Sequence, residues 1–152
     1  MHLINKLLTP GRTLCRAPGV SKKRLFETAA RIISNDQLSL PYDAIFSHLI
    51  AREKLGSTGL GKGIAIPHCR IGNCTQAMSA LITLEDPIQF DAPDSQGVDI
   101  LFVLLVPEEA EQQHLDILAG VAGLFSQSDF CDALRAAKDP ETLHFTATHW
   151  AS

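Results

Sequence analysis

A glycine-rich stretch leads into a proline–histidine pair near the middle of the chain. Residues 56–68 read GSTGLGKGIAIPH, so four glycines precede a short apolar run that ends at Pro67 and His68. Glycine permits backbone conformations and close approaches that side chains forbid, and proline cannot donate the hydrogen bond that would extend a strand. We therefore expect the His68 imidazole at a sheet edge beside free backbone N–H groups, which suits an anion next to a nucleophilic nitrogen.

Two further residues are candidates for the same site. His114 precedes apolar residues at helical spacing, which places it on the inner face of a helix near its N-terminus; these residues are Leu118, Val121 and Phe125. That helix closely follows an apolar run ending at Val106, so His68 and His114 meet if the two strands before them are parallel neighbours. Arg52, one turn before the glycines, is either a phosphate clamp or a helix-end arginine favoured by the helix dipole.

The glycine stretch also has features of a nucleotide-binding loop. Gly56, Gly61 and Lys62 nearly satisfy the nucleotide-binding pattern GxxxxGK[ST], but Gly63 stands where a hydroxyl would hold Mg²⁺. The stretch also follows an expected helix and opens a strand, which is the reverse of a nucleotide-binding loop. A plain glycine-rich connector remains an alternative, because glycine is common in turns.

Metal and thiol chemistry are further alternatives. Cys69 and Cys74, together with His68 and His114, offer four zinc donors. However, no second cysteine pair has ligand spacing, and neighbouring side chains on a strand point apart. A Cys–His nucleophilic pair lacks a third group to orient it. We therefore predict neither a metal nor a cofactor, and we interpret His48, inside an expected helix, as structural.

The composition and charge of the chain limit the classes of protein to which it can belong. The chain has 152 residues, 45% hydrophobic and 20% charged, which is ordinary for one soluble domain. A net charge of −4 argues against a nucleic-acid-binding protein, and no apolar run has the roughly 18 residues of a membrane helix. Four dispersed cysteines, with no signal-peptide pattern before them, indicate reduced thiols. We predict one cytoplasmic domain over residues 1–152 that neither binds nucleic acid nor inserts into a membrane.

Hydrophobic periodicity predicts helices on either side of a group of strands. The expected helices cover residues 3–8, 22–34, 41–55, 108–125, 129–137 and 140–148. The expected strands cover residues 12–15, 64–66, 78–84 and 98–106. The last strand is almost continuously apolar, which is typical of a strand covered on both faces. The order of elements favours an α/β fold, with a sheet between helical layers.

The segment 55–68, LGSTGLGKGIAIPH, closely resembles the active-site segment of the enzyme IIA components of the bacterial phosphotransferase system. It is similar to the mannitol/fructose type, and most of all to the nitrogen-regulatory branch of that type. The likeness extends to PIQFDA at 87–92, VDILF at 98–102, LLVP at 104–107 and the pair His114–Leu115. The resemblance implies a mixed β-sheet with helices on both faces.

The resemblance also implies a mechanism. His68 would accept a phosphoryl group from a histidine-containing phosphocarrier protein, Arg52 would help to hold the phosphate, and His114 would be the second active-site histidine. We add Gly61 and Gly63 as expected phosphate-binding positions, through their backbone N–H groups.

The resemblance further implies a phosphotransferase component that acts mainly as a regulator. Its phosphorylation state would control target proteins such as potassium transport or sensor kinase proteins. The alternative is a IIA component that passes its phosphate to a fructose- or mannitol-type transporter. Cys69 departs from the glycine that commonly follows the active histidine in this family, and its side chain would narrow the backbone's approach to a phosphate.

Overall fold

A six-stranded mixed β-sheet organises residues 3–150, the part of the chain that the computed structural model describes. The strand order is β1-β5-β6-β3-β2, and β4 also pairs with β6. The strands are β1 Thr13–Ala17, β2 Gly59–Gly61, β3 Ile64–Ala65, β4 His68–Ile71, β5 Met78–Ile88 and β6 Val98–Pro107. The two residues at each end of the predicted domain lie outside the described residues, and the single-domain organisation stays a prediction.

Strand β6 is the centre of the molecule. It pairs antiparallel with β5 and parallel with both β3 and β4. Its residues alternate between two hydrophobic cores, with Phe102 and Leu104 in one and Val103 and Leu105 in the other. The apolar run therefore is a strand buried on both faces, as the sequence predicts.

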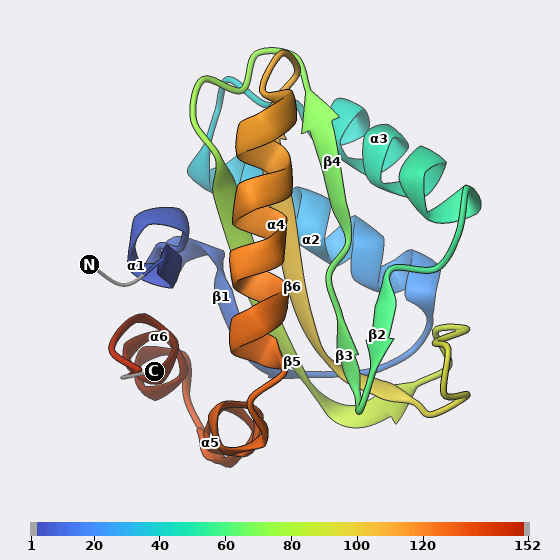
Figure 1. Ribbon diagram of the computed structural model, residues 1–152, viewed down its shortest axis with the longest axis vertical. Coiled ribbons are helices and arrows are strands. Elements are labelled where there is room, and N and C mark those ends of the chain that lie inside the picture. Colours follow the sequence, from blue (N-terminus) through green and yellow to red (C-terminus); the bar gives the residue numbers. More distant parts are fainter. Residues whose placement is uncertain (1–2, 151–152) are drawn as a thin grey trace.

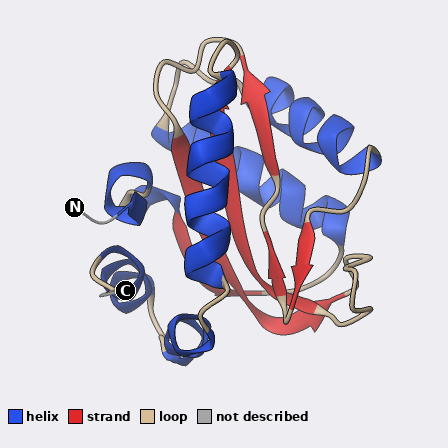
Figure 2. Ribbon diagram, viewed as in Figure 1, coloured by secondary structure: helices blue, strands red, loops and turns tan. Residues whose placement is uncertain are grey.

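Helices cover both faces of the sheet (Figures 1 and 2). Helices α2 and α3 pack on one face, and α1, α4, α5 and α6 pack on the other, with α4 crossing in front of β6 in Figure 1. Their bounds are α1 Leu3–Leu7, α2 Lys22–Asp36, α3 Tyr42–Lys54, α4 Glu111–Phe125, α5 Ser128–Ala136 and α6 Pro140–Thr148. The predicted fold class is confirmed. None of the helices of residues 3–150 combines the length and apolar character needed to cross a lipid bilayer.

Local capping fixes where several helices begin. The Ser21 hydroxyl accepts the Arg24 N–H at the start of α2, and Asp139 caps α6 in the same way. Helix α4 begins at Glu111, three residues later than predicted, because residues 107–110 form a turn. In that turn the N–H of Ala110 donates to the carbonyl of Pro107 at 3.1 Å.

The segment around Pro67 differs from the prediction in two ways. The glycines form the β2–β3 hairpin, in which Lys62 and Gly63 have φ values of 58° and 85°. Positive φ at both central residues is the geometry of a tight two-residue hairpin turn. Strand β3 ends before Pro67, as expected, but a further strand that was not predicted, β4, begins directly after it. The carbonyl of Pro67 accepts the Leu104 N–H at 2.9 Å, and pairing with β6 resumes at His68.

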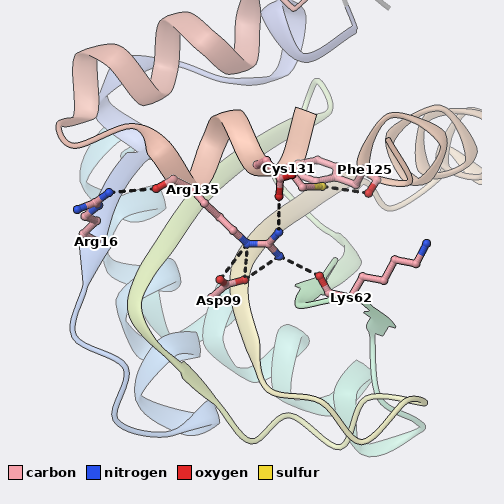
Figure 3. A network of polar contacts seen from close by, with 7 residues as sticks. Arg16, Lys62, Asp99, Phe125, Cys131 and Arg135 are labelled. Carbon is pink, nitrogen blue, oxygen red and sulfur yellow. Dashed lines mark hydrogen bonds and ion pairs between the residues drawn. The ribbon is translucent and has the colours of Figure 1, made fainter. Parts of the chain in front are cut away.

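Arg135 of α5 ties this hairpin to the sheet (Figure 3). Its guanidinium donates to the Asp99 carboxylate at 2.9–3.1 Å and to the Lys62 carbonyl at 2.8 Å. A Cβ on Gly63 would lie 2.6 Å from this guanidinium, so another residue would displace the arginine as well as strain the positive φ of 85°. The arginine thereby joins α5, β6 and the hairpin turn.

We expect Arg135→Gln to lower the free energy of unfolding by about 1–3 kcal/mol, because it leaves a half-buried carboxylate without its charged donor. Urea denaturation followed by circular dichroism measures the loss. The matched control is Asp132→Asn, since Asp132 contacts Arg135 at 3.5 Å with a side chain that is 76% exposed. Equal denaturation midpoints for Arg135→Gln and the wild type would contradict this account.

Candidate active site

His68 is the first residue of β4 and lies opposite Leu104 of β6. The ring is half-buried, and its Nδ1 lies 2.7 Å from the carbonyl oxygen of Ile66. A carbonyl only accepts hydrogen bonds, so Nδ1 carries the ring proton and Nε2 keeps its lone pair. The backbone thus leaves Nε2 as the nucleophilic nitrogen of His68.

His114 lies beside His68. The two ring centroids are 5.4 Å apart with an interplanar angle of 68°, an edge-to-face arrangement. They meet because β3 and β4 run parallel to β6, and α4 begins shortly after β6 ends. The Nε2 atom of His114 is buried and has no hydrogen-bond partner among residues 3–150. A buried imidazole nitrogen of this kind is costly unless a ligand completes it.

Arg52 reaches the site from the end of α3. Its Nη1 donates to the Gly56 carbonyl at 2.9 Å, which anchors one edge of the guanidinium. Arg52 and His68 both line two hollows, of about 390 and 530 Å³. The smaller hollow continues over residues 57–60, and the larger one contains His114. The structure therefore brings Arg52, His68 and His114 to one place.

Glu53 fixes the loop between α3 and β2. Its buried carboxylate accepts from the Thr58 hydroxyl at 2.6 Å and the Thr58 N–H at 3.1 Å, and it forms an ion pair with Lys22 at 2.6 Å. The Gly59 N–H donates to the Ser57 hydroxyl at 3.1 Å. These backbone N–H groups are already engaged, so the expected row of free N–H donors is not present at Thr58 and Gly59.

Both histidines are held in their neutral form. Burial lowers the pKa of His68; the hydrogen bond to Ile66 opposes that shift, and the positive charge of Arg52 adds to it. Burial also lowers the pKa of His114, and His68, Arg70 and Arg52 add electrostatic repulsion of a further positive charge. Neutral imidazole is the nucleophilic form, so the site favours the reactive state of His68.

Gly61 and Gly63 do not lie at the histidines. Ile64, next to the hairpin turn, is opposite Ile100, whereas His68 is opposite Leu104. Four residues along a strand separate the two places by about 13 Å. A Cβ on Gly61 would meet the Asp94 carboxylate at 3.2 Å, and Gly63 packs against Arg135. Because carboxylates surround this turn, the geometry does not support the two glycines as phosphate-binding positions.

The sequence matches a known protein family along most of its length. Residues 6–146 match the family described as "Phosphoenolpyruvate-dependent sugar phosphotransferase system, EIIA 2". The chain belongs to this family. A nitrogen regulatory protein of Pseudomonas aeruginosa is 47% identical over 144 residues, covering 95% of this chain and 94% of the relative. The resemblance to the nitrogen-regulatory branch is thereby confirmed.

Solved structures of IIA proteins agree with this assignment. The crystal structure of the nitrogen regulatory protein IIA-Ntr from Neisseria meningitidis superposes with a TM-score of 0.88 at 42% identity, covering 96% of this chain and 99% of that one. The IIA mannitol protein of Escherichia coli superposes with a TM-score of 0.74 at 12% identity, covering 92% and 98%. At that identity the second likeness concerns the fold alone.

The cysteine-based alternatives do not fit a IIA protein folded in this way. Cys69 and Cys74 both belong to the core beneath α2 and α3, and strand alternation points Cys69 away from the side of His68. Burial raises the pKa of Cys69 to about 12, so its thiol stays protonated. Among residues 3–150 no three His, Cys, Asp or Glu side chains are placed to hold a metal ion together.

Two residues at the site were not predicted as functional. Arg70 and His48 both line the larger hollow with His68 and His114. Arg70 follows His68 by two residues on β4, and residues two apart share one face of a strand. That spacing would have indicated Arg70 if β4 had been recognised in the sequence. His48, which we interpreted as structural, bonds the Ala44 carbonyl through Nδ1 at 2.8 Å.

We expect His68 and His114 to titrate below pH 6.5, which is the ordinary pKa of a solvent-exposed histidine. The folded pKa of each lies below its unfolded value, so the unfolded chain binds more protons in acid. The free energy of unfolding should therefore fall as pH decreases from about 6.5 through the folded pKa values. Histidine NMR titration and urea denaturation at several pH values measure the two effects.

The contribution of Arg52 to the lowered pKa values of His68 and His114 can be measured separately. Arg52→Gln should raise both midpoints, because it removes a nearby positive charge, while burial still keeps them below 6.5. Arg31→Gln is the control, since Arg31 lies over the Tyr42 ring at the other end of α3. A wild-type His68 midpoint above 6.5 would contradict the account.

Proposed function

We propose that the protein is a phosphoryl-accepting regulator of the nitrogen-type phosphotransferase system, phosphorylated on Nε2 of His68. One observation carries the proposal. The Nδ1 hydrogen bond to Ile66 leaves Nε2 unprotonated in a hollow shared with Arg52 and His114. Membership of the IIA family supports the same chemistry.

In the proposed reaction, the lone pair of His68 Nε2 attacks the phosphorus of a phosphohistidine on a carrier protein. The N–P bond to the carrier breaks, and the carrier's imidazole leaves with the electron pair. The His68 ring gains positive charge, and its Nδ1–H strengthens the bond to the Ile66 carbonyl. No proton leaves His68. The protein contributes mainly positioning and charge stabilisation, as in other phosphoryl transfers.

Side chains would bind the phosphoryl oxygens. Arg52 offers a planar guanidinium with one edge already fixed on Gly56. His114 offers Nε2, which is buried without a partner in residues 3–150 and would donate to a phosphoryl oxygen as the Nε2–H tautomer. Because both groups are held in place before the phosphate arrives, little reorganisation is needed during transfer.

Exposed leucines around the hollow would receive the carrier protein. Leu115 is 60% exposed and Leu60 is 48% exposed, and both line the smaller hollow. Leu55 is 85% exposed and lines the larger one. Apolar residues gathered around a reactive group mark an interaction surface, whereas single exposed leucines do not.

The proposed output is regulation in the cytoplasm. A phosphoryl group adds about −1.5 to −2 charge at neutral pH, enough to change which proteins bind the surface around His68. Relatives named nitrogen regulatory protein support this role over sugar transport. Potassium transport and sensor kinase proteins are the target classes that the resemblance suggests.

A pull-down that compares phosphorylated wild type with His68→Ala separates the targets of the phosphorylated protein from those of the unphosphorylated protein. Drainage of the phosphate into a sugar transporter subunit would instead favour the transport role.

We expect His68→Ala to abolish uptake of an acid-labile, base-stable phosphate from the phosphorylated carrier. Arg52→Ala and His114→Ala should slow transfer by about two orders of magnitude, as the loss of a preorganised donor does elsewhere. Rapid-quench labelling measures the rates, circular dichroism checks the fold, and Arg31→Ala is the control. Wild-type labelling of His68→Ala would refute the assignment.

Docking can be separated from chemistry with a small donor. We expect Leu115→Glu to raise the KM for the carrier protein by at least about tenfold, since it places a charge in an apolar contact. Its rate with phosphoramidate should stay at the wild-type value. Leu38→Glu, at a leucine that is 89% exposed between α2 and α3, is the matched control. Equal KM values for the two variants would remove Leu115 from the docking surface.

A further inference from the structure

We propose that Arg70 is a second phosphate-binding residue, and that it leaves Glu111 for the phosphoryl group when His68 is phosphorylated. The inference rests on the proposed function, because it requires a phosphate on His68. Arg70, which has no role in the proposed phosphoryl transfer, would thus change its partner with the phosphorylation state of His68.

The backbone places Arg70 within reach of His68. Both residues lie on β4 and are two positions apart, so their side chains share one face, about 7 Å apart along the strand. Both line the hollow of about 530 Å³ that also contains Arg52 and His114. Arg70 also repels a positive charge on His114, so the two side chains lie within electrostatic range. The length of an arginine side chain covers the remaining distance to Nε2 of His68.

The present partner of Arg70 is weakly held. Its Nη1 lies 3.4 Å from the Glu111 carboxylate, and the side chains are 42% and 84% exposed. An ion pair this exposed to solvent contributes little to stability. A phosphoryl group carries more charge, accepts two parallel N–H bonds from a guanidinium, and would sit in the hollow that Arg70 already lines. The exchange of Glu111 for phosphate is therefore favourable.

The charges around the hollow favour a second cation near the phosphate. Arg52 and His48 face it from α3, and His114 faces it from α4. Glu108 faces it from the turn before α4, and Glu111 begins that helix. The N–H groups of Thr58 and Gly59 are already engaged. A dianion on His68 would share the hollow with the Glu108 carboxylate, and the Arg70 guanidinium would offset that repulsion.

The exchange changes the surface where partners would bind. Glu111 lies one helical turn from Leu115, which is exposed on the proposed docking surface. When Arg70 turns inward, Glu111 loses its positive neighbour, and the negative carboxylate is favoured at the N-terminus of α4. Phosphorylation would thus make the area next to Leu115 more acidic than the phosphate alone would.

The test loads the phosphoryl group with phosphoramidate, so that carrier docking has no part in the result. The proteins are wild type, Arg70→Gln, Arg70→Lys, Glu111→Gln and the double variant, with Arg31→Gln as the control for a lost surface charge. Phosphorus NMR records the pH midpoint at which the phosphoryl group on His68 takes up its proton.

We expect Arg70→Gln to raise that midpoint by roughly half a pH unit, about a threefold gain in proton affinity, because a nearby cation is lost. Arg70→Lys should restore part of the wild-type midpoint. Glu111→Gln should lower the midpoint only while Arg70 is present, because it removes the competing carboxylate. A merely structural role for Arg70 would not produce this dependence.

Equal midpoints in Arg70→Gln and wild type would overturn the inference. The same shift from Glu111→Gln with and without Arg70 would also overturn it, since Glu111 would then act directly on the phosphate. Both results leave the proposed function intact. If wild type takes up no phosphate on His68, the proposed function itself fails, and this inference fails with it.

Discussion

The hydrogen bond between Nδ1 of His68 and the carbonyl of Ile66 is the interaction on which the site depends. It spans only Pro67, whose ring fixes φ and so limits the paths the chain can take between Ile66 and His68. At 2.7 Å it sets the tautomer, and with it the nitrogen that can act as a nucleophile. The orientation of the ring toward Arg52 and His114 follows from the same contact. A backbone acceptor is well suited to this task, because it cannot change its protonation state during the reaction.

The sheet converts this local contact into a site. Strand β6 is buried on both faces, which leaves β3 and β4 in one parallel register beside it. Helix α4 begins four residues after β6 ends, so His114 returns to the end of the sheet where His68 lies. Arg52 arrives from α3 on the other layer. Three segments that are far apart in the sequence thus meet, because β3 and β4 pair with one buried strand and α4 follows that strand.

The elements that the sequence predicted well are those with local signals. The apolar run of β6 and the starts of α2 at Lys22 and α6 at Pro140 each depend on neighbouring residues alone. The meeting of His68 and His114 followed from one assumption, that their preceding strands are parallel neighbours. The glycines were less informative, because glycine suits a hairpin turn and an anion loop equally. Asp94 and Asp99, whose carboxylates decide between the two, lie more than 30 residues further along the chain.

Strand β4 was missed because Pro67 was interpreted as an end. Proline lacks a donor but keeps its acceptor, and here the acceptor maintains the ladder to Leu104. Because β4 was not recognised, the sequence did not indicate that His68 and Arg70 share one face of a strand. The sequence therefore indicated His68 together with Arg52 and His114, which the structure brings to one place, whereas Arg70 required the strand register.

The nitrogen that carries the phosphate tests the central claim most directly. Phosphorus–nitrogen coupling in a phosphorylated protein with ¹⁵N-labelled histidine reports which ring atom bears the phosphoryl group. The account predicts one coupled nitrogen, Nε2 of His68, with Nδ1 still protonated and hydrogen-bonded. A phosphate on Nδ1 of His68, or on another histidine, would contradict it.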